Sequence, residues 1–225
     1  MIQDFFRGRF LTPPDEIAAK LHDIKAYVWD WDGVFNNGFK MDGSSPFNEV
    51  DSMGTNLLRF HHYLLNDGVN PVAAIISGES NGAAHTFAKR EHFQALYFGA
   101  KNKQDALTHL CDSLHIKPQE ILFFFDDVLD FTVSKQAGLR IMIGRQSNPL
   151  MTDYAVRNGL ADYITANDGG HCAIREGVEL ITGLSGKYDE LLDHRIRYSD
   201  AYHHYITQRN AVETAFYKVA EGKII

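Results

Sequence analysis

Short, continuous apolar segments recur along the chain between longer segments whose apolar residues repeat every three or four positions. The short segments predict strands buried on both faces of a sheet, since they lack the alternation of a half-exposed strand. They are residues 26–30, 72–77, 95–99, 121–126, 140–144 and 162–165. The longer segments predict helices at residues 52–68, 81–92, 102–114, 127–138 and 170–183. This alternation indicates an α/β fold, a Rossmann-like parallel sheet flanked by helices.

Two regions depart from the alternation. Residues 33–50 contain two turn signals, Asn-Gly and Asp-Gly, and predict a small β-hairpin flap at the carboxyl end of the sheet, without a large cap. The tail after Gly186 has no glycine or proline before Gly222. It predicts one or two amphipathic helices, because its apolar residues lie mostly three or four positions apart. They are Tyr198, Tyr202, Tyr205, Val212, Phe216 and Val219.

The length and composition fit one domain with additions. The chain has 225 residues, 44% of them hydrophobic, which is enough for one good core. We expect an N-terminal helical extension over residues 1–24, with a helix in 12–24. A core α/β domain over 25–184 and a helical C-terminal extension over 185–225 follow.

The charge and the cysteines narrow the classes of partner. The net charge of −7 implies no basic face, so neither nucleic acid nor a membrane is an expected partner. Cys111 and Cys172 lie far apart and outside any metal-ligand spacing, which fits a reducing compartment. No signal pattern or membrane-length apolar run occurs in the sequence. We therefore predict a cytoplasmic, soluble protein.

Polar residues follow four of the predicted strands directly. Because ligands bind at the carboxyl ends of strands in an open parallel sheet, these residues should converge on one rim. The first strand ends in Asp30, with Asp32 just beyond, and the second ends in Ser77 and Gly78. The others lead to Lys103 at a helix start, to the pair Asp126 and Asp127, and to Asp130.

These residue types suit phosphoryl transfer with Mg²⁺. Carboxylates from two strands and a backbone carbonyl can hold this cation, while a lysine and a hydroxyl neutralise phosphoryl oxygens. One carboxylate can attack phosphorus, and a second can protonate the leaving oxygen. Taken alone, an Asp-x-Asp-Gly segment more often forms a turn than a catalytic site. A single lysine is more often a solvated surface residue, and a single serine is more often a helix cap. The order and placement of the residues carry the prediction.

The motifs resemble those of the haloacid dehalogenase-like hydrolases. "DWDGV", "IISG", Lys103 and "DDVLD" match the four motifs of that superfamily in order. Within it the chain most resembles the 3-deoxy-D-manno-octulosonate 8-phosphate phosphatases over roughly residues 25–183. The supporting stretches are "DWDGVFNNG", "FNEVDSMG", "GAKNKQDAL", "FFFDDVLDF" and "ADYITANDGGHCAIRE".

The resemblance implies an Mg²⁺-dependent phosphatase that hydrolyses a small phosphorylated sugar or sugar acid through an aspartyl-phosphate. Its catalytic residues would be Asp30 as nucleophile, Asp32 as general acid and base, Ser77 and Lys103. Asp30, the Asp32 carbonyl and Asp126 would hold the metal, with Asp127 and Asp130 in support. The resemblance also implies a homo-oligomer, commonly a tetramer, whose flap and neighbouring subunit close the site. The residues expected to bind phosphate or substrate are Gly33, Gly78, Glu79 and His171.

The sequence departs from the family at three positions, and these motivate a second hypothesis. Glu79 stands where a basic residue is usual, and Phe125 and Cys172 replace glycines. A catalytically silent domain that serves oligomerisation or assembly is the alternative. Retention of every acidic motif residue argues against it, because buried carboxylates repel one another without a cation.

Two further readings are weaker. A phosphomutase or phosphotransferase usually needs a large mobile cap, and the sequence holds only the flap. The histidine pairs at 61–62 and 203–204 point in different directions on a helix, so we expect ordinary surface or partly buried histidines.

Overall fold

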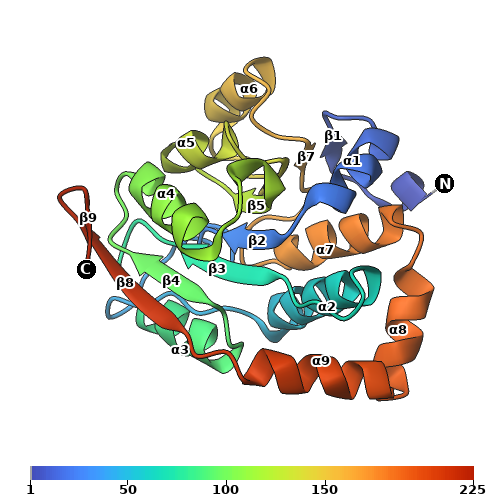
Figure 1. The fold of residues 1–225 in the computed structure, drawn as a ribbon. Coiled ribbons are helices and arrows are strands. Elements are labelled where there is room, and N and C mark those ends of the chain that lie inside the picture. The colour runs from blue at the N-terminus through green and yellow to red at the C-terminus, as the bar shows by residue number, and fades with distance from the viewer. Residues whose placement is uncertain (1) are drawn as a thin grey trace.

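The computed structural model describes residues 2–225. They fold around a nine-stranded sheet (Figure 1). The strand order is β1-β7-β6-β5-β2-β3-β4-β8-β9, and every pair from β7 through to β8 is parallel. Only the two outermost strands, β1 and β9, pair antiparallel. The strands are β1 (Arg9–Phe10), β2 (Ala26–Trp29), β3 (Val72–Ile76), β4 (Ala95–Phe98), β5 (Ile121–Phe125), β6 (Leu139–Met142), β7 (Tyr163–Ile164), β8 (Ala215–Ala220) and β9 (Lys223–Ile224).

Helices cover both faces of the sheet, which confirms the predicted fold class. One face packs on α1 (Pro14–Lys20), α2 (Glu49–Leu65), α3 (Gly82–Arg90) and α7 (Ala173–Leu184), with α8 (Tyr188–Ile196) and α9 (Asp200–Asn210) outside α2 (Figure 1). The other face packs on α4 (Lys103–Leu114), α5 (Phe131–Ser134) and α6 (Pro149–Arg157). Short 3-10 turns lie at Ile2–Phe5, Leu21–Asp23, Pro118–Glu120 and Val128–Asp130.

The central strands are apolar throughout because both of their faces are buried. In β2, Tyr27 and Trp29 join the core under α2 and α7, whereas Ala26 and Val28 join the core under α4. All four side chains are 3% exposed or less. This two-sided burial explains the continuous apolar pattern of the strand.

The C-terminal tail is helical only in its first part. Helices α8 and α9 lie where helices were predicted, but residues 215–220 form β8 instead of continuing the helical pattern. β8 pairs in parallel with β4, and Val219 is buried in the core under α4. The helical prediction was therefore wrong for Phe216 and Val219, because in β8 hydrogen bonds to the β4 edge replace helical ones, and for Val212, which lies beyond the end of α9. Local spacing cannot reveal that partner.

Three other elements differ from the predictions. The N-terminal extension holds its helix, α1, but also β1, which pairs with β7. Helix α6 was not predicted, because a single buried residue, Ala155, gives it little apolar periodicity. The predicted β-hairpin is reduced to one bridge between Met41 and Ser44. Asp42 and Gly43 form its turn with positive φ angles of 52° and 76°.

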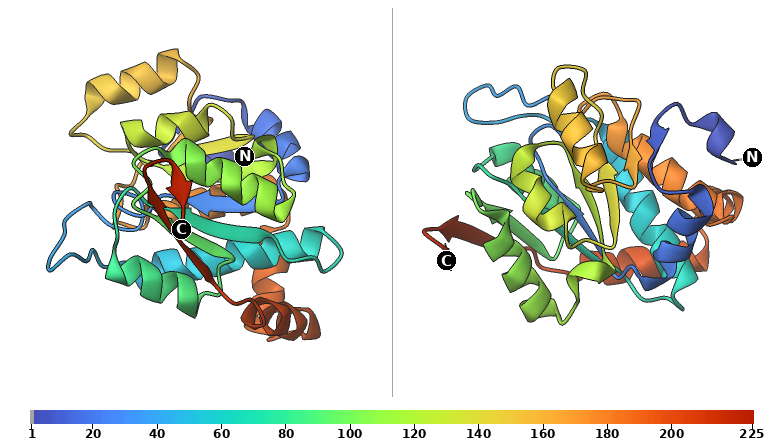
Figure 2. Two further views of the ribbon diagram at one scale, coloured as in Figure 1. Left: turned by 60° about the vertical axis from the view of Figure 1, so that its left-hand side comes forward. Right: turned by 90° about the horizontal axis from the view of Figure 1, so that it is seen from above.

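The segment between β2 and α2 is a loop that projects past the carboxyl ends of the strands, coloured light blue in Figure 2. We call residues 36–48 the flap. Its base is fixed by Asn36, whose side chain accepts from the Gly38 N–H at 2.8 Å and donates to the Trp31 carbonyl at 3.2 Å. No large cap domain interrupts the described residues.

Candidate active site

Asp30 and Lys103 meet at the centre of the rim. Asp30 follows β2 directly, and Lys103 is the first residue of α4, which Asn102 caps. Lys103 Nζ lies 2.8 Å from Asp30 Oδ1 and also contacts Asp130 Oδ1. The lysine side chain is only 1% exposed. A buried cation of this kind requires such anionic partners to offset its desolvation.

The electrostatics of Asp30 fit a reactive carboxylate. The pKa of Asp30 is raised to about 7, chiefly by burial, with Lys103 opposing the shift and the Asp130 charge adding to it. Burial alone would lower the pKa of Lys103, but the carboxylates of Asp130 and Asp30 outweigh it and raise that pKa. The Trp31 N–H donates to Asp30 Oδ1 at 2.6 Å. Lys103 and Trp31 therefore hold Oδ1, and neither contact uses Oδ2.

Asp126 and Asp130 complete an acidic cluster with Asp30. One carboxylate oxygen of each lies within 4.8 Å of the others, and all three side chains are buried. Asp126 Oδ1 has no hydrogen-bond partner among the described residues. Burial, together with the charges of Asp30 and Asp130, raises the pKa of Asp126. A buried set of mutually repulsive carboxylates in which Asp126 Oδ1 has no partner among the described residues fits a hard divalent cation such as Mg²⁺.

Asp32 faces the flap. Its Oδ1 accepts from Ser45 Oγ at 2.9 Å and from Asn81 Nδ2 at 3.3 Å, while Lys40 Nζ lies 3.0 Å from its Oδ2. Asn81 also caps α3 by accepting from the Ala83 N–H. The two acids at the exit of β2 therefore have different surroundings: Asp30 belongs to the buried cluster, and Asp32 belongs to the flap. This division fits two different roles.

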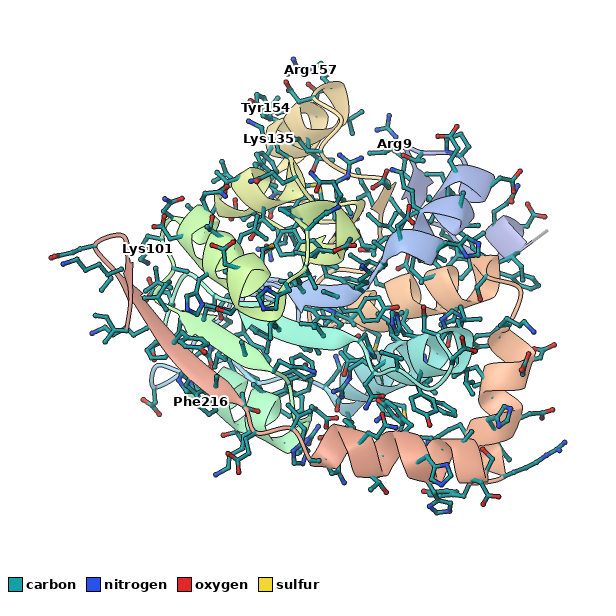
Figure 3. All side chains as sticks on the ribbon, in the orientation of Figure 1. Arg9, Lys101, Lys135, Tyr154, Arg157 and Phe216 are labelled. Atoms are coloured by element: carbon teal, nitrogen blue, oxygen red, sulfur yellow. The ribbon has the colours of Figure 1, made fainter. Side chains whose placement is uncertain are left out.

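Ser77, Gly78 and Glu79 lie at the exit of β3, next to β2. Ser77 is 1% exposed, its N–H donates to the Tyr97 carbonyl, and its Oγ accepts from the Glu79 N–H at 3.4 Å. Glu79 is exposed and forms an ion pair with Lys101. Figure 3 labels Lys101 just before α4. The Lys101 hydrogen bond and charge lower the pKa of Glu79, and the charge of Lys40 contributes.

Gly33 makes room beside Asp126. A Cβ atom at Gly33 would lie 2.0 Å from Asp126 Oδ2, and the residue has a φ of +89°, so only glycine suits this position. The requirement is both steric and conformational. Gly33 is thus a structural neighbour of the Asp126 carboxylate.

Asp127, Asp130 and His171 lie in different surroundings. Asp127 is exposed and accepts from its neighbour Val128, so its side chain lies outside the acidic cluster. Asp130 is fully buried, and its Oδ2 accepts from the Asp127 N–H at 3.1 Å. His171 is exposed and lines a cavity of about 240 Å³ beneath the flap with Asn36, Asn37 and Asn48.

The structure shows the surroundings of the three unusual residues. Phe125 is fully buried between β5 and α5, where its ring meets Phe123 and Phe131. Cys172 has a φ of +66° at the start of α7, a conformation that favours glycine. Glu79 is neutralised by Lys101. The contacts of Phe125 and Glu79 are thus with residues outside the acidic cluster of Asp30, Asp126 and Asp130.

Sequence reasoning missed four polar side chains near the site. Lys40, Ser45 and Asn81 hold Asp32, and Arg145 contacts Asp126. Arg145 follows β6 just as Asp126 follows β5, so the strand-exit rule could have found it had it been applied to the fifth predicted strand. The flap residues carry no such signal, because an irregular loop does not reveal where its side chains point.

Comparisons with known proteins agree with this geometry. No protein-family model matches the chain. The chain is 28% identical over 180 residues to the 3-deoxy-D-manno-octulosonate 8-phosphate phosphatase KdsC of Escherichia coli K12, covering 78% of this chain and 88% of that protein. No helix in residues 2–225 has the length and apolar character required to cross a membrane.

Solved structures of the same kind of enzyme superpose on most of the chain. The phosphatase from Moraxella catarrhalis, in complex with magnesium ion, phosphate ion and KDO, has a TM-score of 0.63 and 26% identity, covering 80% of this chain and 98% of that one. The Yersinia pestis phosphatase has a TM-score of 0.63 and 26% identity, covering 78% and 89%. The predicted resemblance is confirmed: the chain is similar in sequence and in fold to the 3-deoxy-D-manno-octulosonate 8-phosphate phosphatases.

Proposed function

We propose that the protein is a magnesium-dependent phosphatase that hydrolyses a small phosphorylated sugar or sugar acid through an aspartyl-phosphate on Asp30. The observation that carries this function is the buried cluster of Asp30, Asp126 and Asp130, against which Lys103 is packed. The KdsC relatives and the solved phosphatases support the same reaction class.

Asp30 is the proposed nucleophile. Lys103 and the Trp31 N–H both hold Oδ1, so the carboxylate keeps a fixed orientation while it attacks phosphorus and the bond to the leaving oxygen breaks. Orientation of this kind lowers the barrier because the entropy of alignment is lost before the reaction. Lys103 and the Ser77 hydroxyl would bind phosphoryl oxygens.

Asp32 is the proposed general acid and base. It gives a proton to the leaving oxygen, then takes a proton from the water that attacks phosphorus and releases phosphate from Asp30. Lys40, Ser45 and Asn81 fix its carboxylate at the base of the flap. Asp30 and Asp32 would thus act differently, one as nucleophile and one as acid and base. This explains why two acids lie at the exit of β2.

Asp30, Asp126 and the Asp32 carbonyl would hold Mg²⁺, which when bound neutralises charge on the phosphoryl oxygens. Asp130 would support the site indirectly. It forms an ion pair with Lys103, and its Oδ2 accepts from the Asp127 N–H, which closes the turn of residues 126–130. Asp127 caps that turn and lies outside the cluster. Gly33, Gly78, Glu79 and His171 stay predicted contacts of phosphate or substrate.

The substrate and the assembly are finer proposals. The first compound to test is 3-deoxy-D-manno-octulosonate 8-phosphate (KDO 8-phosphate). The E. coli relative is named as its phosphatase, and the M. catarrhalis structure holds KDO and phosphate. A homo-oligomer, with a tetramer as the implied form, is supported by the exposed Phe39 and Met41 on the flap. Light scattering coupled to size exclusion tests it. A cytoplasmic location stays a prediction.

The silent-domain alternative is disfavoured by the cost of the cluster. Burial and the charges of Asp30 and Asp130 raise the pKa of Asp126, and this repulsion destabilises the fold unless a cation compensates. Mg²⁺ and beryllium fluoride, a phosphate mimic, should therefore both bind. A protein that binds neither would favour the assembly role.

A phosphatase screen tests the proposal directly. Phosphorylated sugars and sugar acids are incubated with the protein, either with Mg²⁺ in excess over the protein or with a chelator. The phosphate released under each condition is measured. Phosphate release that requires Mg²⁺ supports the function. Metal-independent release, or none with any compound, contradicts it.

A further inference from the structure

Arg145 occupies one side of the Asp126 carboxylate. Its Nη2 donates to Asp126 Oδ2 at 2.8 Å and lies 3.5 Å from the Gly33 carbonyl. Arg145 lies in the loop after β6. The residues of the acidic cluster follow β2 and β5 instead. The side chain is 25% exposed, and that of Asp126 is 3% exposed.

The two oxygens of Asp126 are therefore in different situations. Oδ2 accepts from the guanidinium, whereas Oδ1 is buried without a hydrogen-bond partner in residues 2–225. Asp126 is at the same time a member of the cluster with Asp30 and Asp130. The arrangement leaves one oxygen for a cation and engages the other.

Gly33 keeps this arrangement in place. A Cβ atom there would lie 2.0 Å from Asp126 Oδ2 and 2.6 Å from Arg145 Nη2. The pair thus sits tightly against backbone that lacks a side chain. Rotation of the carboxylate to offer both oxygens to the cluster would break the contact with Arg145.

Carboxylate denticity distinguishes Mg²⁺ from Ca²⁺. Mg²⁺ demands near-ideal octahedral geometry with short bonds, while Ca²⁺ takes more ligands at longer distances and accepts bidentate carboxylates. Residues that orient a metal ligand typically change metal affinity by 10- to 100-fold when they are removed. We propose that Arg145 restricts Asp126 to one coordinating oxygen and so sets the preference of the site for Mg²⁺ over Ca²⁺. This inference rests on the metal centre of the proposed function.

The ratio of affinities separates orientation from charge. Loss of the arginine charge alone would strengthen binding of both cations similarly, since both carry two positive charges. Only a change in carboxylate geometry should favour one of them. The informative quantity is therefore the Ca²⁺ affinity divided by the Mg²⁺ affinity, with no turnover needed.

The test uses Arg145→Met, which keeps a long side chain without donors, and Arg145→Lys, which keeps the charge. Titration calorimetry gives both affinities, and circular dichroism confirms folding. Arg145→Met should raise the ratio by about tenfold. Arg145→Lys should raise it less, because an ammonium can still donate to Oδ2. Lys101→Met, which removes a charge near the rim without touching Asp126, should leave the ratio unchanged.

A ratio that stays within about twofold in Arg145→Met, or that rises equally in Lys101→Met, overturns the inference. A parent protein that binds neither cation overturns it together with the proposed metal centre. If the parent binds Mg²⁺ and the ratio shifts as expected, but no phosphorylated compound is hydrolysed, the inference stands and the proposed function fails.

Discussion

Lys103 Nζ lies 2.8 Å from Asp30 Oδ1, and the pair joins the start of α4 to the end of β2 inside the protein. The Lys103 ammonium also contacts Asp130 Oδ1, so one lysine forms ion pairs with two buried carboxylates. The contact links the fold to the chemistry, because the residue that holds the proposed nucleophile also stabilises the rim. Removal of Lys103 should therefore affect both.

Lys103→Met should destabilise the protein and abolish turnover. Removing one partner from a buried ion pair typically costs about 3–5 kcal/mol, and protonation of Asp30, whose pKa is already about 7, should lower this cost. Urea unfolding at pH 7.5 measures the loss. Lys187→Met is the matched control, because Lys187, just before α8, and its partner Glu190 on α8 are both exposed, and it should cost much less stability. Equal losses in the two variants would contradict the burial argument.

The sequence was sufficient for the part of the site that depends on strand exits. Asp30, Ser77 and Asp126 each follow a buried strand, and parallel order brings those ends together. Lys103 was found in the same way, because it begins the helix after β4. Such residues are predictable since their positions depend on the sheet alone.

Other features could not be predicted because they depend on contacts between distant segments. Residues 215–220 share apolar spacing with a helix, but they form β8 because β4 offers an unpaired edge. Lys40 reaches the site from the irregular flap, whose side-chain directions no periodicity gives. Asp127 was expected beside the metal, yet it caps a turn and is exposed.

Glu79 should tune the choice between neutral and acidic substrates. Its carboxylate pairs with Lys101 at the rim, so it both adds negative charge and occupies a cation. Glu79→Gln should improve kcat/KM for a carboxylated substrate relative to a neutral one by several-fold. Glucose 6-phosphate and 6-phosphogluconate, or another matched pair that the protein hydrolyses, give the ratio.

The control for Glu79→Gln is Glu190→Gln, which breaks an exposed lysine–glutamate pair on α8 instead. It should leave the substrate ratio unchanged. An unchanged ratio in Glu79→Gln as well would mean that the acid does not face the substrate.

The buried histidines of α2 should make the fold sensitive to acid. Burial lowers the pKa of His62 to about 4, against 6.5 in the unfolded chain, and His62 Nδ1 lies 3.3 Å from the Tyr27 hydroxyl. The unfolded state therefore binds a proton first as the pH falls, so stability present above pH 6.5 is lost between pH 6.5 and 4. The raised pKa of Asp30 acts in the opposite direction over the range from about 7 to 3.8.

A comparison of variants isolates the histidine. Glutamine in His62→Gln keeps a polar partner for Tyr27 but does not titrate. Between pH 7.5 and 4.5, the free energy of unfolding of this variant should therefore fall by about 2 kcal/mol less than that of the parent. Urea unfolding at both pH values measures this difference. Parallel losses in parent and variant would show that His62 protonates equally in the folded and unfolded states.

The strand β8 should protect the edge of the sheet. It pairs with β4, Tyr217 stacks on Tyr97, and Figure 3 labels Phe216 on this outer strand, where its ring stacks on His85. A chain that ends at residue 211 would expose β4, and uncovered edges promote aggregation. It should melt at a lower temperature and scatter more light than a chain that ends at Ala220. Identical behaviour would mean that β8 is dispensable.

The most direct test of the enzymatic account is the activity of Asp30→Asn with Mg²⁺ and the best substrate from the screen. Asparagine keeps the shape of the side chain but cannot form an acyl-phosphate, and it removes a carboxylate whose burial raises its pKa. The variant should fold as well as the parent and lose turnover by roughly a thousandfold or more. A folded Asp30→Asn protein that keeps full activity would contradict the assignment of Asp30 as the nucleophile.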